Sequence, residues 1–415
     1  MQEKKFEAVA SGEQHPQYAV HIHRESELYA RPNDIRSPYA RDFTRILHCL
    51  AYRRLKHKTQ VFFNIDNDHI CTRMEHVQHV ESVSCTIAKF LGLNTDLTRA
   101  VAMGHDLGHA PFGHEGENEL SAIRARYGLD KFWHERNSLR MIDSIELLRD
   151  AEGRYQNLDL TYAVRDGIIA HCGEVDENGL MPRTEAIDLA DFSRPGQYDP
   201  FTWEGCVVKI SDKIAYLGRD IEDALRLDFL SADDLAELRQ IGDRHHEPEI
   251  NTTVLIHNFI TDICATSTPE TGIRLSDPYH ALLTEIKQFN YRHIYMNQKF
   301  KVYKDYVSLI LKSIFDLLIS AYDGERTPER LRALRRSYPM LAGDMERHLY
   351  HYSDLLPTDS TADEIRTHWH NRKIYGRLAT ERDYAIAILD YIAGMTDAYA
   401  VRAFNELLTY RSGGE

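Results

Sequence analysis

An apolar stripe with helical spacing constrains the fold of this chain more than any other feature. Its members recur every three or four residues and are Val207, Ile210, Ile214, Leu217, Ile221 and Leu225. This spacing puts one face of an α-helix against a core, because a strand alternates with a period of two. Similar stripes recur along most of the 415 residues, so we predict an all-α protein. Val61–Cys71 is the exception and favours at most a small β-hairpin or an extended loop.

Composition excludes several classes of protein. Hydrophobic residues make up 43% and charged residues 27% of the chain, as in ordinary globular proteins. No apolar run approaches the length of about 18 residues that a membrane helix needs, and the first residues carry no signal-peptide pattern. The six cysteines are scattered without a CxxC pair, which predicts reduced thiols in a cytoplasmic protein. A net charge of −14 argues against nucleic acid as the main ligand, because that binding depends on neutralising phosphates with Lys and Arg.

The run Met103–Glu117, MGHDLGHAPFGHEGE, contains the clearest chemical motif. Adjacent His105 and Asp106 offer a divalent metal one nitrogen and one oxygen ligand. The residues that shape the following loop are Gly108, Pro111 and Gly113. Glycine permits positive φ and proline restricts the turn, so we expect a tight loop that brings His109 and His114 near the metal. A structural, hydrogen-bonded imidazole is the alternative for His109.

Two flanking helices offer further ligands. His76 lies at the start of one predicted helix, and Arg73 precedes it by one turn, so a metal ligand and a phosphate clamp would face one cavity. The helix with the long apolar stripe has an opposite polar face that contains Asp212, Tyr216, Arg219 and Asp220. Taken alone, such a face would be solvated surface. Beside a His–Asp motif it favours a ligand-lining face with Asp212 on the metal.

The candidate metal ligands are two imidazoles and two carboxylates, namely His76, His105, Asp106 and Asp212. This set suits Mn, Fe, Mg, Co, Ni or Zn, and the absence of thiolates argues against a closed structural zinc site. Such an ion would polarise a phosphoryl oxygen and activate water. Glu117 follows His114 by three residues, and a carboxylate within reach would orient that imidazole and favour its protonated form.

These motifs together resemble a known family. They are Arg73-x-x-His76, the run from His105 to His114, and Asp212-Lys213-Ile214-Ala215-Tyr216. They resemble the HD-domain superfamily and, within it, the deoxynucleoside triphosphate triphosphohydrolases, the dGTPase-like branch. The segments Arg41–His48 and Arg53–Val61 are also similar to that branch. The family implies an all-helical HD core and hydrolysis of a dNTP to the deoxynucleoside and inorganic triphosphate.

The resemblance implies a role for each matching position. His76, His105, Asp106 and Asp212 would bind the divalent metal. The catalytic residues would be His114 as the acid/base group, Glu117 orienting it, His109 and His134. The substrate residues would be Arg73 and Lys213 for phosphates, and Gln60, Tyr216 and Asp220 for the sugar. Around His134 the sequence reads FWHERN, which departs from the family pattern, closer to FEHNAQ.

The resemblance covers about Arg31 to Leu225. We therefore expect a phosphohydrolase core over residues 30–230, with metal motifs at 73–212, and a helical region over residues 231–415 for oligomerisation or regulation. The family implies a dNTP as substrate and a homo-oligomer, and it leaves open an activating nucleotide. Leu283–Tyr303 mixes aromatics with Lys and Arg and favours an amphipathic helix, with an oligomer contact or a second nucleotide site as alternatives.

Two other functions are compatible with these motifs. One is an HD phosphohydrolase that acts on a cyclic dinucleotide, an alarmone or a nucleoside monophosphate, which would not need Gln60, Tyr216 and Asp220 to recognise deoxyribose. The other is a non-catalytic nucleotide sensor with a residual metal site. Degenerate members of a family usually lose ligands, whereas all four are present here. Hydrolysis of dGTP or of several dNTPs is therefore the leading hypothesis.

Overall fold

Helices dominate the computed structural model, which describes residues 4–26, 34–62, 69–172, 178–247 and 249–409. These residues form eighteen α-helices and one two-stranded sheet, which confirms the predicted all-α class with a small hairpin. The hairpin expected at Val61–Cys71 falls largely on residues 63–68, outside the described residues. The observed antiparallel pair is β1 (Leu147–Arg149) with β2 (Tyr155–Asn157).

The chain forms two compact units, and each is built from three separate segments. Unit 1 comprises Met1–Leu47, Gln60–Asp106 and Asp159–Lys301. Unit 2 comprises His48–Thr59, Leu107–Leu158 and Val302–Glu415. The units therefore interleave along the sequence. The division into a phosphohydrolase core over residues 30–230 and a helical region over residues 231–415 stays a prediction.

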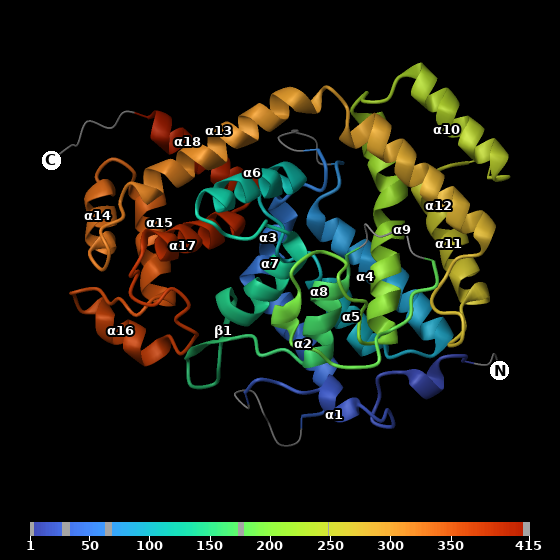
Figure 1. The fold of residues 1–415 in the computed structure, drawn as a ribbon, viewed down its shortest axis with the longest axis horizontal. Coiled ribbons are helices and arrows are strands. Elements are labelled where there is room, and N and C mark those ends of the chain that lie inside the picture. The colour runs from blue at the N-terminus through green and yellow to red at the C-terminus, as the bar shows by residue number, and fades with distance from the viewer. Residues whose placement is uncertain (1–3, 27–33, 63–68, 173–177, 248, 410–415) are drawn as a thin grey trace. The chain divides into compact units, whose positions relative to one another are not determined.

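One helix organises unit 1. The helices of this unit are α1 (Tyr18–His21), α2 (Pro38–His48, ending at the unit boundary), α4 (Arg73–Leu91), α5 (Thr95–Gly104), α8 (Tyr162–Ala170), α9 (Trp203–Arg226), α10 (Ala232–Arg244), α11 (Thr252–Thr266) and α12 (Asp277–Asn290). Helix α9 packs against α4, α5, α8, α11 and α12, and its course beside α4 and α11 can be followed in Figure 1. Its predicted stripe is buried from Val207 to Ile221, whereas Leu225 is exposed.

Local sequence signals set the ends of these helices. The Thr72 hydroxyl accepts from the backbone N–H of Glu75, and the Glu75 carboxylate accepts from the backbone N–H of Thr72, which forms a capping box before α4. Helix α4 ends at Gly92, whose φ of 90° favours glycine. Helices α5 and α9 begin after Asn94 and Thr202, whose side-chain oxygens accept backbone N–H groups of the first turn.

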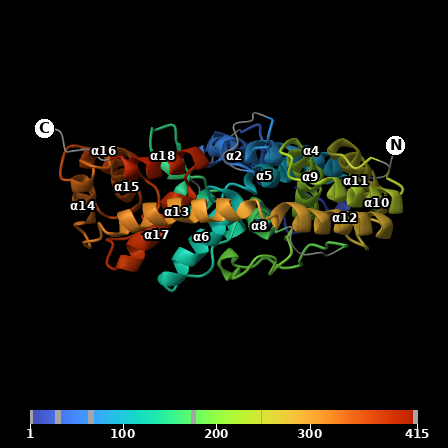
Figure 2. The same cartoon turned by 90° about the horizontal axis from the view of Figure 1, so that it is seen from above.

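Unit 2 is built mainly around the C-terminal helices. Its helices are α3 (Leu50–Arg54), α6 (Gly113–Arg126), α7 (His134–Arg140), α13 (Phe300–Ile319, starting at the unit boundary), α14 (Thr327–Leu334), α15 (Pro339–Tyr352), α16 (Thr361–His368), α17 (Glu381–Ala393) and α18 (Asp397–Leu408). Helix α15 packs against α14, α17 and α18, and α17 also packs against α6. Figure 2 shows α15, α17 and α18 gathered near the label C. This packing anchors α6, which carries Glu117.

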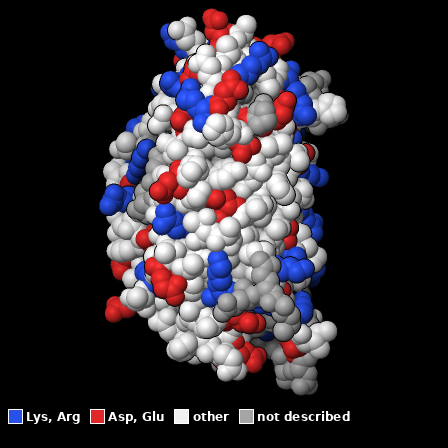
Figure 3. All heavy atoms as spheres, turned by 90° about the vertical axis from the view of Figure 1, so that its right-hand side faces the viewer, with Lys and Arg blue, Asp and Glu red and all other residues white. Residues whose placement is uncertain are grey.

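The helices and the surface charges can be compared with the expectations about membrane spans and nucleic-acid binding. Within the described ranges, no helix is long and apolar enough to cross a membrane. On the face drawn in Figure 3, Lys and Arg lie interspersed with Asp and Glu among the described side chains. A nucleic-acid surface concentrates basic side chains on one face, so this face lends no support to nucleic acid as a ligand.

Candidate functional site

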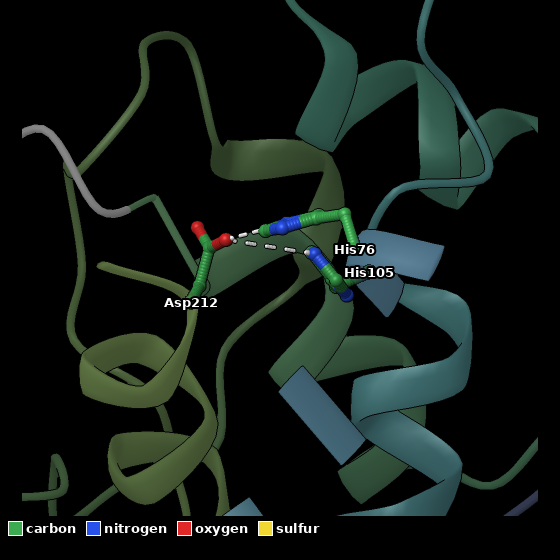
Figure 4. A group of neighbouring side chains, drawn as sticks. All are labelled: His76, His105 and Asp212. Atoms are coloured by element: carbon green, nitrogen blue, oxygen red, sulfur yellow. Dashed lines mark hydrogen bonds and ion pairs between the residues drawn. The ribbon is translucent and has the colours of Figure 1, made fainter. Parts of the chain in front are cut away.

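Three packed helices of unit 1 bring together predicted metal ligands from distant parts of the sequence. His76 lies in the first turns of α4, His105 is the residue that follows α5, and Asp212 lies in the middle of α9. These three helices pack against one another, so the side chains at their contact converge. Figure 4 shows both imidazoles directed toward the Asp212 carboxylate.

The separations in this group match a shared ion. Nε2 of His76 is 2.9 Å from Oδ1 of Asp212, and Nε2 of His105 is 3.8 Å from the same oxygen. All three candidate ligand atoms lie within 4.8 Å of one another. Ligand atoms that each lie about 2.1 Å from one ion are at most about 4.2 Å apart. These three side chains would therefore need to move only slightly to bind one ion together.

Asp106 adjoins the same group. Its Oδ1 lies 3.5 Å from Nε2 of His105, and its Oδ2 lies 3.9 Å from Nε2 of His76. Arg73, one turn before His76, donates from Nη1 to Oδ2 of Asp106 at 2.8 Å. Both side chains of this ion pair are almost fully buried. The predicted phosphate clamp therefore lies directly beside the predicted metal ligands.

Protonation states in this cluster suit a divalent cation. Nδ1 of His105 lies 2.7 Å from the carbonyl oxygen of Ala102, and a carbonyl only accepts, so Nδ1 holds the proton and Nε2 keeps its lone pair. Burial by itself would raise the pKa of Asp212, but the hydrogen bond of His76 and the nearby histidine charges outweigh it and lower that pKa. An anionic carboxylate and an imidazole lone pair in a buried site are the donors that such a cation requires. These residues therefore fit a divalent metal ion.

The pKa of His76, next to Asp212, also shows that this site favours positive charge. Burial alone would lower the pKa of His76. The hydrogen bond and charge of Asp212, with the charge of Asp106, raise it instead. A proton on His76 thus neutralises part of the carboxylate charge, and a bound cation would take over that role.

The predicted substrate residues also lie in unit 1. Lys213 is buried and directly follows Asp212 on α9, while Tyr216 and Asp220 lie one and two turns further along the helix. Gln60 is linked to the cluster through its backbone, because its carbonyl oxygen accepts from Nη2 of Arg73 at 3.4 Å. Three of these positions thus share α9 with Asp212, and Gln60 contacts Arg73 of α4.

Asp220 has a partner that the sequence did not reveal. Tyr295 ends a π-helical turn, Tyr291–Tyr295, that follows α12, and its hydroxyl donates to Oδ2 of Asp220 at 2.5 Å. Burial raises the pKa of Asp220 to about 7. This turn interrupts the amphipathic helix predicted over Leu283–Tyr303, and π-helical turns occur often at functional sites. The aromatic content of that segment was its only signal in the sequence.

The predicted acid/base residues form a second cluster, in unit 2. Oε1 of Glu117, on α6, lies 2.6 Å from Nδ1 of His109 and 3.3 Å from Nδ1 of His134. The two imidazoles stack with ring centroids 3.7 Å apart. Burial by itself would raise the pKa of Glu117, but the charges of His134 and His109 lower it well below its usual range. Glu117 is therefore anionic and can hold a proton on either ring.

His114 lies beside this stacked pair. Its ring centroid is 6.1 Å from that of His109 and 6.4 Å from that of His134. His114 is exposed, whereas His109 is buried. We expected Glu117 to orient His114, and the ion pairs that the structure gives this carboxylate are with His109 and His134. The three histidines and Glu117 form one acid/base cluster with a single exposed ring.

The loop that carries His109 depends on close backbone packing within unit 2. The Gly108 carbonyl accepts from the Asn137 amide at 2.7 Å, and its N–H donates to the Ser138 hydroxyl at 2.8 Å. The sequence predicts a tight loop, in which Gly108 and Gly113 permit positive φ. Positive φ is found at Gly113 (58°) and at Phe112 (65°), but Gly108 serves another purpose. A Cβ there would lie 2.0 Å from the backbone nitrogen of Ser138, so the close approach requires glycine.

Two buried residues that the sequence analysis missed hold this loop. Asp397, at the start of α18, accepts from the backbone N–H of Phe112 at 2.9 Å and from the Thr59 hydroxyl at 2.8 Å. Lys58 donates to the carbonyl oxygen of His109. Neither lies in a motif with ligand spacing, so only their burial in the folded unit identifies them.

Two protein-family models match separate parts of the chain. The HD domain family model matches residues 73–217, a range that contains the four candidate metal ligands. The model of the phosphohydrolase-associated domain matches residues 345–406, which include Asp397.

Curated relatives match most of the chain. Each of the three described here is named a deoxyguanosinetriphosphate triphosphohydrolase-like protein. The protein from Desulfatibacillum aliphaticivorans is 37% identical over 299 residues, which are 70% of this chain and 76% of the relative. The protein from Caldanaerobacter subterraneus subsp. tengcongensis is 32% identical over 92% of this chain and 89% of its own length. The protein from Clostridium tetani is 30% identical over 90% of this chain and 86% of its own length.

Proposed function

The chain belongs to the HD-domain phosphohydrolase family of the deoxyguanosinetriphosphate triphosphohydrolase-like proteins, and we propose that it hydrolyses dNTPs to the deoxynucleoside and inorganic triphosphate. The observation that carries this proposal is the cluster of buried His76 and His105 with half-buried Asp212, beside the buried ion pair of Asp106 and Arg73. The relatives are named for dGTP, so dGTP is the first substrate to test. Mn, Mg, Fe, Co, Ni and Zn are the candidate ions.

The cluster in unit 1 would bind the triphosphate. A bound divalent ion would polarise a phosphoryl oxygen and lower the pKa of a water molecule. Arg73 and Lys213 would oppose a substrate charge of about −4. Arg73 has five N–H donors, so its guanidinium can keep the Asp106 ion pair and still donate to a phosphate oxygen.

The histidines of unit 2 would supply the proton that the leaving 5′-oxygen requires. Anionic Glu117 favours a proton on His109 or His134, and the exposed ring of His114 lies beside them. We propose that His114 is the general acid and that the other two histidines and Glu117 sustain its protonation. General acid catalysis of this kind typically contributes about 10²- to 10⁴-fold.

Gln60, Tyr216 and Asp220 would recognise the deoxyribose. With a pKa of about 7, the Asp220 carboxyl can donate or accept a hydrogen bond near neutral pH. Its hydrogen bond with Tyr295 holds it in place on α9. These side chains would fit closely around a deoxyribose. A ribose 2′-hydroxyl placed there would clash with them or lack a hydrogen-bond partner, and the site would therefore reject a ribonucleotide.

A product assay tests this function. Purified protein with Mn²⁺ or Mg²⁺ is given each dNTP and GTP, singly and in mixture, and the products are separated by ion-exchange chromatography. We expect the deoxynucleoside and inorganic triphosphate. His105→Ala and Asp106→Ala should reduce turnover by more than about 100-fold, since even outer-shell partners of metal ligands cost about 10- to 100-fold.

The controls separate the alternatives. His79→Ala, on α4 but outside the ligand group, should retain turnover. Turnover only in mixtures would indicate an activating nucleotide, and light scattering of the same sample tests the expected homo-oligomer. Metal binding without release of triphosphate from any dNTP would refute the proposal and direct the search to cyclic dinucleotides, alarmones and nucleoside monophosphates.

A further inference from the structure

A further side chain, which is buried, adjoins the four candidate metal ligands of unit 1. His171 follows α8 as its C-terminal cap and is 1% exposed. Its ring centroid lies 4.9 Å from that of His105, with an angle of 80° between the ring planes. His171 belongs to none of the motifs that identified the other ligands, and helix packing between α5 and α8 brings it there.

The hydrogen bonding of His171 repeats that of His105. Nδ1 of His171 lies 2.6 Å from the carbonyl oxygen of Ile168, as Nδ1 of His105 lies 2.7 Å from that of Ala102. In both cases the carbonyl belongs to the residue three positions earlier, in the last turn of a helix. A carbonyl only accepts, so Nδ1 carries the proton and the neutral ring has its lone pair on Nε2. This arrangement is typical of histidines that bind metals, where a second hydrogen bond selects the tautomer.

Two groups of potential ligands share one histidine. His105, Asp106 and His171 have ligand atoms within 4.8 Å of one another, as do His105, His76 and Asp212. Nε2 of His105 has one lone pair and can bind one ion only. An ion bound to His105 would therefore adjoin both groups, which together offer three imidazoles and two carboxylates.

We propose that His171 binds, through Nε2, the same ion as the four ligands predicted from the sequence. This inference rests on the metal dependence contained in the proposed function. It has two consequences. A third imidazole shifts the preference of the site from Mg²⁺ toward Fe, Co, Ni or Zn, because imidazole suits these ions and oxygen ligands suit Mg²⁺. Five protein ligands also leave fewer positions on the ion for water and substrate than four would.

The test counts histidine nitrogens on the ion rather than measuring turnover. Full-length protein with ¹⁵N-labelled histidine is loaded with Mn²⁺ and examined by pulsed electron paramagnetic resonance. His171→Asn retains an N–H group that can donate to the Ile168 carbonyl but removes the distal nitrogen. We expect one histidine nitrogen fewer on the ion, and metal affinity weaker by about 10-fold or more, measured by chelator competition.

Two further variants control for misfolding. His21→Asn changes another buried histidine of unit 1, one that shares a hydrogen bond with the Ser11 hydroxyl at 2.7 Å and lies outside the ligand group. It should keep the nitrogen count and affinity of the unchanged protein. His171→Gln offers an amide oxygen near the former Nε2, so it should recover part of the affinity without recovering the nitrogen signal.

The outcomes separate this inference from the proposed function. An unchanged nitrogen count in His171→Asn overturns the role of His171, even if the protein releases triphosphate from dNTPs. A reduced count in a protein that turns over no dNTP supports the role of His171 and overturns only the proposed function. Unchanged affinity in His171→Asn also overturns the inference.

Discussion

Replacing Gly108 with alanine tests whether rigid backbone packing holds the loop that carries His109. A Cβ at Gly108 would lie 2.0 Å from N of Ser138, 2.4 Å from C of Asn137 and 2.4 Å from O of His134. Carbon atoms in favourable contact are about 3.5–4.0 Å apart, and these neighbours are backbone atoms of α7 that cannot rotate away. Overpacking typically costs about 1–3 kcal/mol, and the rigid neighbours place Gly108→Ala at the upper end, about 3 kcal/mol.

Thermal denaturation of the full-length protein measures this cost. A loss of about 3 kcal/mol lowers the midpoint by about 6–12 °C in a unit of about 150–250 residues. Gly12→Ala is the matched control, because a Cβ there meets no atom within 4 Å, and it should change stability by less than about 0.5 kcal/mol. If Gly108→Ala has the same melting midpoint as the unchanged protein, the loop can move to accommodate the added Cβ, and the packing argument is wrong.

Three further predictions concern charge and metal. Glu117→Gln removes the anion 2.6 Å from Nδ1 of His109. This change should lower the free energy of unfolding, measured with denaturant, by about 3–5 kcal/mol and should lower kcat by about 10²- to 10⁴-fold. A variant whose stability and kcat match those of the unchanged protein would contradict the role assigned to Glu117. Burial raises the pKa of Asp220 from 3.8 to about 7, so between these values the folded state keeps a proton that the unfolded state has lost. Stability of the metal-free protein should therefore fall as pH rises through this range, and Asp220→Asn should flatten the decline; parallel pH curves for the two proteins would refute this. Removal of metal with EDTA should lower the melting midpoint, and Mn²⁺ at about 100 times its Kd should restore about 2.7 kcal/mol; the same response in His105→Ala would place the ion elsewhere.

Much of the candidate metal site could be predicted because its signals are local. The capping residues Thr72 and Asn94 lie next to the helices that they start. His105 and Asp106 are adjacent in sequence, and the period of the apolar stripe separates Asp212 from the buried face of α9. The expected all-α class follows from the same periodicity, since each helix signals its own buried face.

Other features depend on contacts between distant segments. The sequence predicts that Glu117 orients His114, three residues earlier, and that pairing stays a prediction. The folded unit adds ion pairs of Glu117 with His109 and His134, which no sequence spacing indicated. Spacing along one helix limits which side chains can meet, but the partner is selected by whatever packs against that helix. Gly108 is a second example. The sequence pattern predicts a tight turn there, but it does not predict the close contacts of Gly108 with the backbone of α7.

By itself the sequence determined the helical class, the positions of helix starts and the candidate ligands, since periodicity, caps and motifs act over a few residues. Only the tertiary structure decided that residues from three separate segments form each unit. It also placed Tyr295 against Asp220 and His171 beside His105. These contacts join segments far apart in the chain, and helix packing against a shared core decides which of many compatible faces meet.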